Sequence, residues 1–208
     1  MSKSLQTLIA ALLLSTATQA VAASSVDLSV RGLITPSACE PTLSNGGVYD
    51  LGKIAAKDLN PDRPSFFPYH SLQMTVTCDA PTLMGLQSQD NRAGSHFQND
   101  EIYEFGLGLI NGDEKLGALG MRLIKPLADG VAARTVSSED GGATWYNDNY
   151  LYRNNIISVA ALGTLVPIAV QVFSAELAIS PAIAPTNSLT LNNEVAIDGS
   201  VTLTVMYL

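Results

Sequence analysis

Two cysteines, Cys39 and Cys78, are the residues of this 208-residue chain best suited to covalent chemistry. They can form a disulfide, stay as free thiols or supply half of a metal site. A structural zinc site takes about four ligands, and the two histidines, His70 and His96, have no ligand motif beside them. The N-terminal segment described below predicts export. An exported chain matures where thiols are oxidised, so we expect one disulfide.

The remaining reactive side chains do not form a recognisable catalytic set. General acid–base or nucleophilic catalysis needs a base positioned beside its partner, and neither histidine has such a neighbour in the sequence. No G-x-S-x-G elbow occurs. Gly106-Leu107-Gly108 lacks the third glycine of a dinucleotide fingerprint and is interpreted as a β-bulge. The sequence therefore predicts no enzyme and no cofactor.

An acidic stretch and an aromatic stretch lie close together in the chain. Glu139, Asp140 and Asp148 surround glycines, but their spacing is not that of a calcium-binding EF-hand, which favours a solvated loop. The aromatic residues suit a recognition surface for a sugar or a partner protein, since their rings are apolar and their edges polar. The alternative is that they cap one end of the fold. They are Trp145, Tyr146, Tyr150 and Tyr152.

The N-terminus has the three parts of a secretory signal peptide. Lys3 supplies the positive charge, residues 8–14 are almost wholly apolar, and Ala20-Val21-Ala22 is a small-x-small cleavage pattern. We expect cleavage after Ala22, with Ala23 as the neighbouring choice. An uncleaved anchor is disfavoured because the apolar run is shorter than the roughly 20 residues that span a bilayer.

Removal of residues 1–22 leaves 186 of the 208 residues, enough for one domain with its own core. It also removes Lys3, so the formal net charge changes from −8 to −9. Nucleic-acid binding depends on Lys and Arg neutralising phosphates, and the chain is therefore not expected to bind it. No transmembrane segment is expected after signal removal.

Alternating apolar and polar residues dominate the rest of the chain and predict strands at 26–30, 72–76 and 201–207. Turns are expected at Gly46-Gly47 and at 60–64, where glycine, proline and asparagine gather. No stretch has a convincing helical period. Short strands with frequent turns predict an all-β antiparallel β-sandwich.

A hairpin is expected in the middle of the chain, with strands at 103–110 and 116–124 joined by a tight Asn111-Gly112 turn. We predict loops with one or two short strands over 128–155, and a helical turn over 159–164. A buried strand is expected over 168–174, followed by a loop that contains Pro181 and Pro185.

Three segments carry a resemblance to a known family. Residues 30–39 place Cys39 on a first strand, 74–78 end a second strand on Cys78, and 198–208 form a last alternating strand with tyrosine next to the end. This set resembles the pilin subunits of chaperone–usher fimbriae, and more narrowly the periplasmic GltF-like family. The sequence departs from many pilins at 195–196, where they have a glycine.

The resemblance implies an immunoglobulin-like (pilin-type) sandwich that lacks its last strand and is completed by a donor strand. It further implies a periplasmic chaperone, an outer-membrane usher and neighbouring fimbrial subunits as partners, and passage through the periplasm to a cell-surface fimbria. The resulting domain plan is a signal peptide at 1–22, an N-terminal extension at 23–34 and a sandwich domain at 35–208.

The resemblance assigns roles to both ends of the mature chain. The donor strand would present Val26, Leu28, Val30 and Ile34, with Gly32 allowing close backbone approach, although the same residues suit the first strand of the chain's own sheet. The receiving and chaperone-binding edge would consist of Val201, Leu203, Val205, Tyr207 and Leu208, unless these form an ordinary last strand. The alternative function is a soluble periplasmic ligand-binding or regulatory module with a complete fold.

Overall fold

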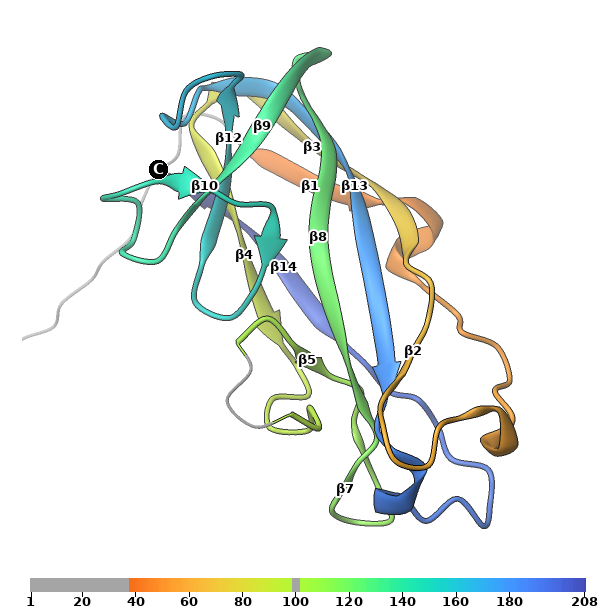
Figure 1. The fold of residues 1–208 in the computed structure, drawn as a ribbon. Coiled ribbons are helices and arrows are strands. Elements are labelled where there is room, and N and C mark those ends of the chain that lie inside the picture. The colour runs from red at the N-terminus through yellow and green to blue at the C-terminus, as the bar shows by residue number, and fades with distance from the viewer. Residues whose placement is uncertain (1–37, 99–101) are drawn as a thin grey trace, which may run out of the picture. The chain divides into compact units, whose positions relative to one another are not determined.

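The computed structural model describes residues 38–98 and 102–208 and is built almost entirely of antiparallel β-strands (Figure 1). The signal peptide and the candidate donor residues Val26 to Ile34 lie outside the described residues. Contacts group Thr35–Leu208 into one unit. None of the helices in the described residues is long and apolar enough to cross a membrane.

The strands follow one another with short connections, and only three short 3-10 helices interrupt the described residues. The helices are η1 (Ser44–Gly47), η2 (Ala56–Asp58) and η3 (Thr186–Ser188). The strands are β1 (Cys39–Leu43), β2 (Ser65–Phe66), β3 (His70–Thr82), β4 (Met84–Asp90), β5 (Phe105–Gly106), β6 (Leu109–Ile110), β7 (Glu114–Lys115), β8 (Gly117–Ala128), β9 (Val131–Ser138), β10 (Tyr146–Asn147), β11 (Tyr150–Leu151), β12 (Ile156–Ala161), β13 (Val170–Ile183) and β14 (Val201–Tyr207).

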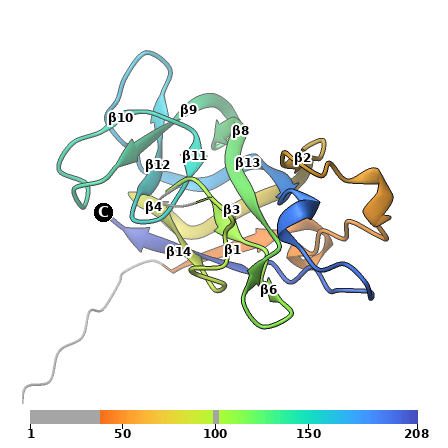
Figure 2. The same ribbon diagram turned by 60° about the horizontal axis from the view of Figure 1, so that its bottom comes forward.

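The main sheet has the strand order β1-β3-β13-β8-β9-β12-β4-β14. It curls so that β1 and β14, the first and last strands of this order, lie side by side (Figure 2). No ladder among the described residues joins these two strands, although the backbone N–H of Cys39 donates to the Tyr207 hydroxyl at 3.1 Å. The sheet is therefore nearly closed, with its two edges facing each other.

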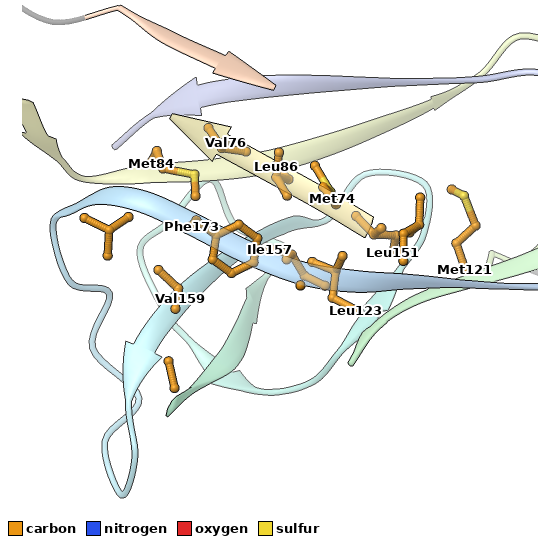
Figure 3. Close-up of a cluster of buried hydrophobic side chains, with 14 of the residues drawn as sticks. Met74, Val76, Met84, Leu86, Met121, Leu123, Leu151, Ile157, Val159 and Phe173 are labelled. Carbon is orange, nitrogen blue, oxygen red and sulfur yellow. The ribbon is translucent and has the colours of Figure 1, made fainter. Parts of the chain in front are cut away.

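The core fills the space between the two halves of the curled sheet (Figure 3). The period-two pattern places Met74 and Val76 of β3 on the inner face, where they meet Leu86 of β4 and Ile157 of β12. Phe173 of β13 is fully buried at the centre. Burying one such large apolar side chain stabilises the fold by roughly 1.5–3 kcal/mol.

The expected hairpin is present in part. Positive φ values at Asn111 and Gly112 support the predicted tight turn. The first strand, however, is interrupted, because Gly108 has a φ of +91° and splits it into β5 and β6. The returning strand β8 continues to Ala128, and most of its length pairs with β13 rather than with the hairpin.

Three local predictions were wrong. Residues 159–164 do not form a helical turn, since β12 runs through 161. Within 128–155, β9 is a full strand of eight residues. The strand predicted at 168–174 continues to 183 and includes Pro181. Proline is tolerated there because Pro181 falls between the β3 and β2 ladders, where no ladder needs an N–H donor, and its carbonyl still accepts from the Phe67 N–H.

Candidate functional site

The last strand, β14, has one paired edge and one open edge. It pairs with β4 from Val201 to Tyr207, and no other strand of the described residues pairs with it. Three alternate side chains face the core and remain only half-buried, those of Val201, Leu203 and Val205. The core is thus incompletely covered along the open edge of this strand.

The opposite wall is formed by β1 and the turn that follows it. Cys39 is bonded to Cys78, its register partner on β3, which confirms the expected disulfide. After Leu43 the chain turns sharply through Asn45 and Gly46, which have positive φ values. Since β1 therefore ends after five residues, it leaves the space beside β14 uncovered.

A groove of about 540 Å³ lies between these two walls. Its apolar floor comes from side chains of β3, β8 and β13, and its rims come from β1 and β14. A second hollow of about 520 Å³ follows it and shares Tyr49, Leu51 and Ile197 with the first. Its apolar lining comes from Leu51, Ile54, Leu59, Leu116, Ile183, Leu191, Val195 and Ile197.

The groove is bridged at the end of β14. The Tyr207 hydroxyl accepts from the Cys39 N–H across the groove, whereas the Leu208 N–H extends the paired side of β14 by donating to the Leu83 carbonyl at 3.1 Å. Beyond the start of β14, an exposed ion pair of 3.1 Å between Lys53 and Glu194 spans the second hollow. Exposed ion pairs of this kind contribute little to stability, so this part of the groove is weakly held.

The segment before β14 is anchored by a two-point ion pair. Arg92 Nη2 and Nε donate to the two carboxylate oxygens of Asp198 at 2.8 and 3.0 Å. The bonded Arg92 guanidinium lowers the pKa of Asp198, and the carboxylate raises the pKa of Arg92 in turn. The Asp198 N–H also donates to the Leu107 carbonyl. These contacts fix where β14 begins.

Of the five residues predicted as a receiving edge, Val201 and Leu203 line the groove, and the other lining residues were not predicted from the sequence. The floor residues on β8 and β13 have no mark of their own, because they look like any core residue. The segment that leads along the second hollow did carry a pattern in the sequence. Leu189, Leu191, Val195 and Ile197 occur at even spacings, which is the period of an extended segment with one face covered.

The four aromatic residues predicted as a recognition surface do not share one. Tyr152 is only 1% exposed, whereas Tyr146 and Tyr150 are partly exposed. The Tyr152 and Tyr146 hydroxyls donate to Glu139 Oε1 at 2.5 and 2.8 Å, and Trp145 Nε1 donates to the Gly142 carbonyl. Burial raises the pKa of Tyr152, and the tyrosine hydroxyls lower the pKa of Glu139.

The neighbouring acidic loop is organised by its own hydrogen bonds. Asp140 accepts from the hydroxyl and N–H of Thr144 at 2.6 and 2.9 Å and from the Ser138 hydroxyl at 2.7 Å. These donors lower the pKa of Asp140 to about 2, with the Thr144 hydroxyl acting most strongly. Its oxygens are thus engaged within the loop. The described residues contain no cluster of three metal-ligating side chains.

The two histidines occupy separate environments. His70 stacks on Tyr49 with ring centroids 4.6 Å apart, beside the groove. His96 is buried, and its Nδ1 lies 2.5 Å from the Gln98 carbonyl oxygen. The structure does not bring them together.

Comparisons with known proteins agree with the more specific part of the resemblance. Residues 28–104 match the family described as "Protein of unknown function (DUF1120)". The chain is 28% identical to protein GltF of Escherichia coli K12 over 223 residues, which cover 88% of each protein. It is 32% identical over 79 residues to the uncharacterized protein YhcF of the same organism, covering 38% of this chain and 33% of that one. The chain is therefore similar to GltF over most of its length, and the other two similarities cover only part of it.

Proposed function

We propose that this chain is a structural or adhesive subunit of a bacterial surface fimbria. In this proposal it is an immunoglobulin-like sandwich that lacks one strand and is completed by a donor strand. The observation that carries the proposal is the apolar groove beside the open edge of β14, where Val201, Leu203 and Val205 are half-buried. An uncovered strand edge promotes association with other chains.

An added strand would satisfy both features of the groove. Its backbone would pair with the open edge of β14, and alternate side chains would enter the groove and set the register. Every strand pairing within the described sheets is antiparallel. We therefore expect the donor to run antiparallel to β14.

The donor in this proposal is residues 23–34 of a neighbouring copy. Val26, Leu28 and Val30 have the spacing needed to point into one groove, with Ile34 at the end. At roughly 3.3 Å per residue, this segment extends about 40 Å, longer than the seven residues of β14. It would therefore also reach the second hollow. Before assembly, a periplasmic chaperone would cover the groove, and an outer-membrane usher would deliver the subunit to the surface.

The test is to supply the donor within one chain. A copy of residues 24–34 placed after Leu208 through a short turn can run antiparallel to β14. We expect it to raise the melting temperature and to reduce self-association, because it fills the groove. The matched control is the same appended copy with its second apolar position, Leu28, changed to Asp. Equal melting temperatures for the two fusions would show that the groove does not accept this strand.

The other candidate function, a complete ligand-binding module that uses Trp145 to Tyr152, has less support. A ligand-binding aromatic surface needs exposed rings with available polar edges. Here Tyr152 is buried, and the polar atoms of Tyr146 and Trp145 already bond within the loop. This arrangement fits a loop that supports itself.

A further inference from the structure

One end of the sheet has an apolar surface that the groove does not include. It is formed by the β8–β9 turn, the β12–β13 loop and the adjoining start of β13. Val131, Leu162 and Val166 are 69%, 64% and 70% exposed, values unusual for side chains of this type. We call this surface the apolar end; its residues are Leu127, Val131, Leu162, Leu165, Val166 and Val172.

Hydrogen bonds hold the parts of the apolar end beside one another. Asp129, in the β8–β9 turn, donates its N–H to the Val172 carbonyl at 2.8 Å, and its carboxylate accepts from the Val172 N–H at 2.7 Å. The β12–β13 loop closes on itself through the Ile168 N–H and the Val159 carbonyl. β12 then aligns Ala161 with Ala133 on β9, two residues from Val131. The exposed side chains are therefore held on an ordered scaffold.

The described chain also begins at this end of the sheet. The Ala38 N–H donates to the Asp79 carboxylate, and the Ala38 carbonyl accepts from the Asp79 N–H. Asp79 lies near the end of β3, and Thr82, the last residue of β3, pairs with Val170 at the start of β13. Ala38 is thus on the same end as the apolar surface, opposite the β6–β7 hairpin (Figure 1).

Only residues 35–37 separate the candidate donor from Ala38. The four Cα–Cα steps from Ile34 to Ala38 span about 14 Å at most. A donor that runs antiparallel to a neighbour's β14 finishes near Val201, the end where that neighbour carries the β6–β7 hairpin and the 189–200 segment. The donating domain must then sit directly against that end.

We infer that the apolar end is the contact surface between successive copies of this chain, packing against the end of the next copy that carries the β6–β7 hairpin. This inference rests on the proposed strand exchange for its geometry. The contact is head-to-tail and joins two different surfaces, so it can be repeated along an open filament. Leu109, which is 51% exposed on β6, offers an apolar partner on the receiving end.

Charge argues against an anionic partner at the apolar end. The chain has a net charge of −8, so it repels an anionic lipid or a nucleic acid. Copies of the chain also repel one another wherever acidic surfaces meet. None of the six residues of the apolar end is charged. Contact through this surface brings copies together without placing acidic side chains directly opposite one another.

The inference is tested with a photo-crosslinking residue in the full exported chain, at Val166 in one variant and at Leu203 in another. Exposed Ala143 serves as the control position. We expect Val166 to crosslink to residues of a second copy near Leu109, and Leu203 to crosslink to residues 23–34 of a second copy. Crosslinks from Val166 to lipid or to no protein, with the Leu203 product present, would overturn the contact surface but not strand exchange. A Val166 product without the Leu203 product would overturn strand exchange and support the contact.

A charge substitution gives a second readout. Leu162→Asp places a carboxylate on the apolar end without touching the groove, and Ala143→Asp is its control. Loss of one buried leucine contact weakens association about tenfold or more. Unchanged assembly of Leu162→Asp relative to Ala143→Asp would refute the inference.

Discussion

The disulfide should supply a large share of the stability of this domain. Cys39 and Cys78 are 39 residues apart in sequence. In the chain-entropy treatment, closing a loop of about 40 residues destabilises the unfolded chain by about 4 kcal/mol at 25 °C. For a domain of this size, each kcal/mol shifts the melting temperature by about 2–4 °C. Reduction of the bond is therefore expected to lower the melting temperature by roughly 8–16 °C.

The loss should be concentrated on one strand. β1 is an edge strand of five residues whose ladder runs to β3 alone. Without the disulfide, the strand is held beside the groove by that short ladder and by a few further hydrogen bonds, which include those of Tyr207 and of Ala38 with Asp79. We expect hydrogen exchange at 39–43 to accelerate before the rest of the sheet does.

The assay is thermal and urea unfolding of the mature chain with and without reductant, followed by hydrogen exchange of both forms. A Cys39→Ala/Cys78→Ala chain is the control, since reductant should not change its stability. The reasoning would be refuted if reduction lowered the free energy of unfolding by less than about 1 kcal/mol, because the entropic effect predicts a larger loss. Full protection of β1 from hydrogen exchange in the reduced chain would also refute it, because an edge strand is expected to open first.

Three other changes probe other parts of the fold. Tyr207→Phe removes the hydroxyl that accepts from the Cys39 N–H, and should cost about 0.5–1 kcal/mol in urea unfolding; an unchanged midpoint would contradict this. Gly106→Ala would place a Cβ 2.0 Å from a side-chain oxygen and should destabilise by about 1–3 kcal/mol, whereas Gly120→Ala has open space and should be nearly neutral. The pKa of Asp140 is lowered from 3.8 to about 2, so the ionised carboxylate contributes fully to folding stability above pH 4, and this contribution is lost as the pH falls toward 2. Asp140→Asn should therefore flatten the dependence of stability on pH between 4 and 2. Parallel pH profiles for the variant and the parent chain would contradict the assignment.

Local patterns predicted much of this fold because they are set by neighbouring residues. Alternation at 72–76 and 201–207 identified β3 and β14, and Asn111-Gly112 identified a turn that needs positive φ. The same approach failed at 159–164. A short apolar run cannot distinguish a buried strand from a helical turn, and the pairing of residues 159–161 with β9 decides it in the structure.

The groove itself could be predicted only at its rim. The cysteines and the alternating C-terminus are visible in the sequence, and they mark the two strands that face each other across the groove. Its floor comes from β3, β8 and β13, which are brought together by ladders between distant parts of the chain. No local pattern encodes such pairings, so neither the volume nor the lining of the groove can be obtained from spacing.

The position of the ends of the chain links the groove to the apolar end. The disulfide, Ala38 and Tyr207 all lie where β1 begins and β14 finishes. A donor strand that runs antiparallel to β14 in the groove finishes near Val201, at the end of the domain away from the disulfide. In the proposed assembly, a short linker requires contact between unlike ends of two copies, and exposed Leu162 and Val166 would provide apolar surface for that contact. The open edge and the exposed loop residues, which are separate features of an isolated domain, would then be two parts of one assembly contact.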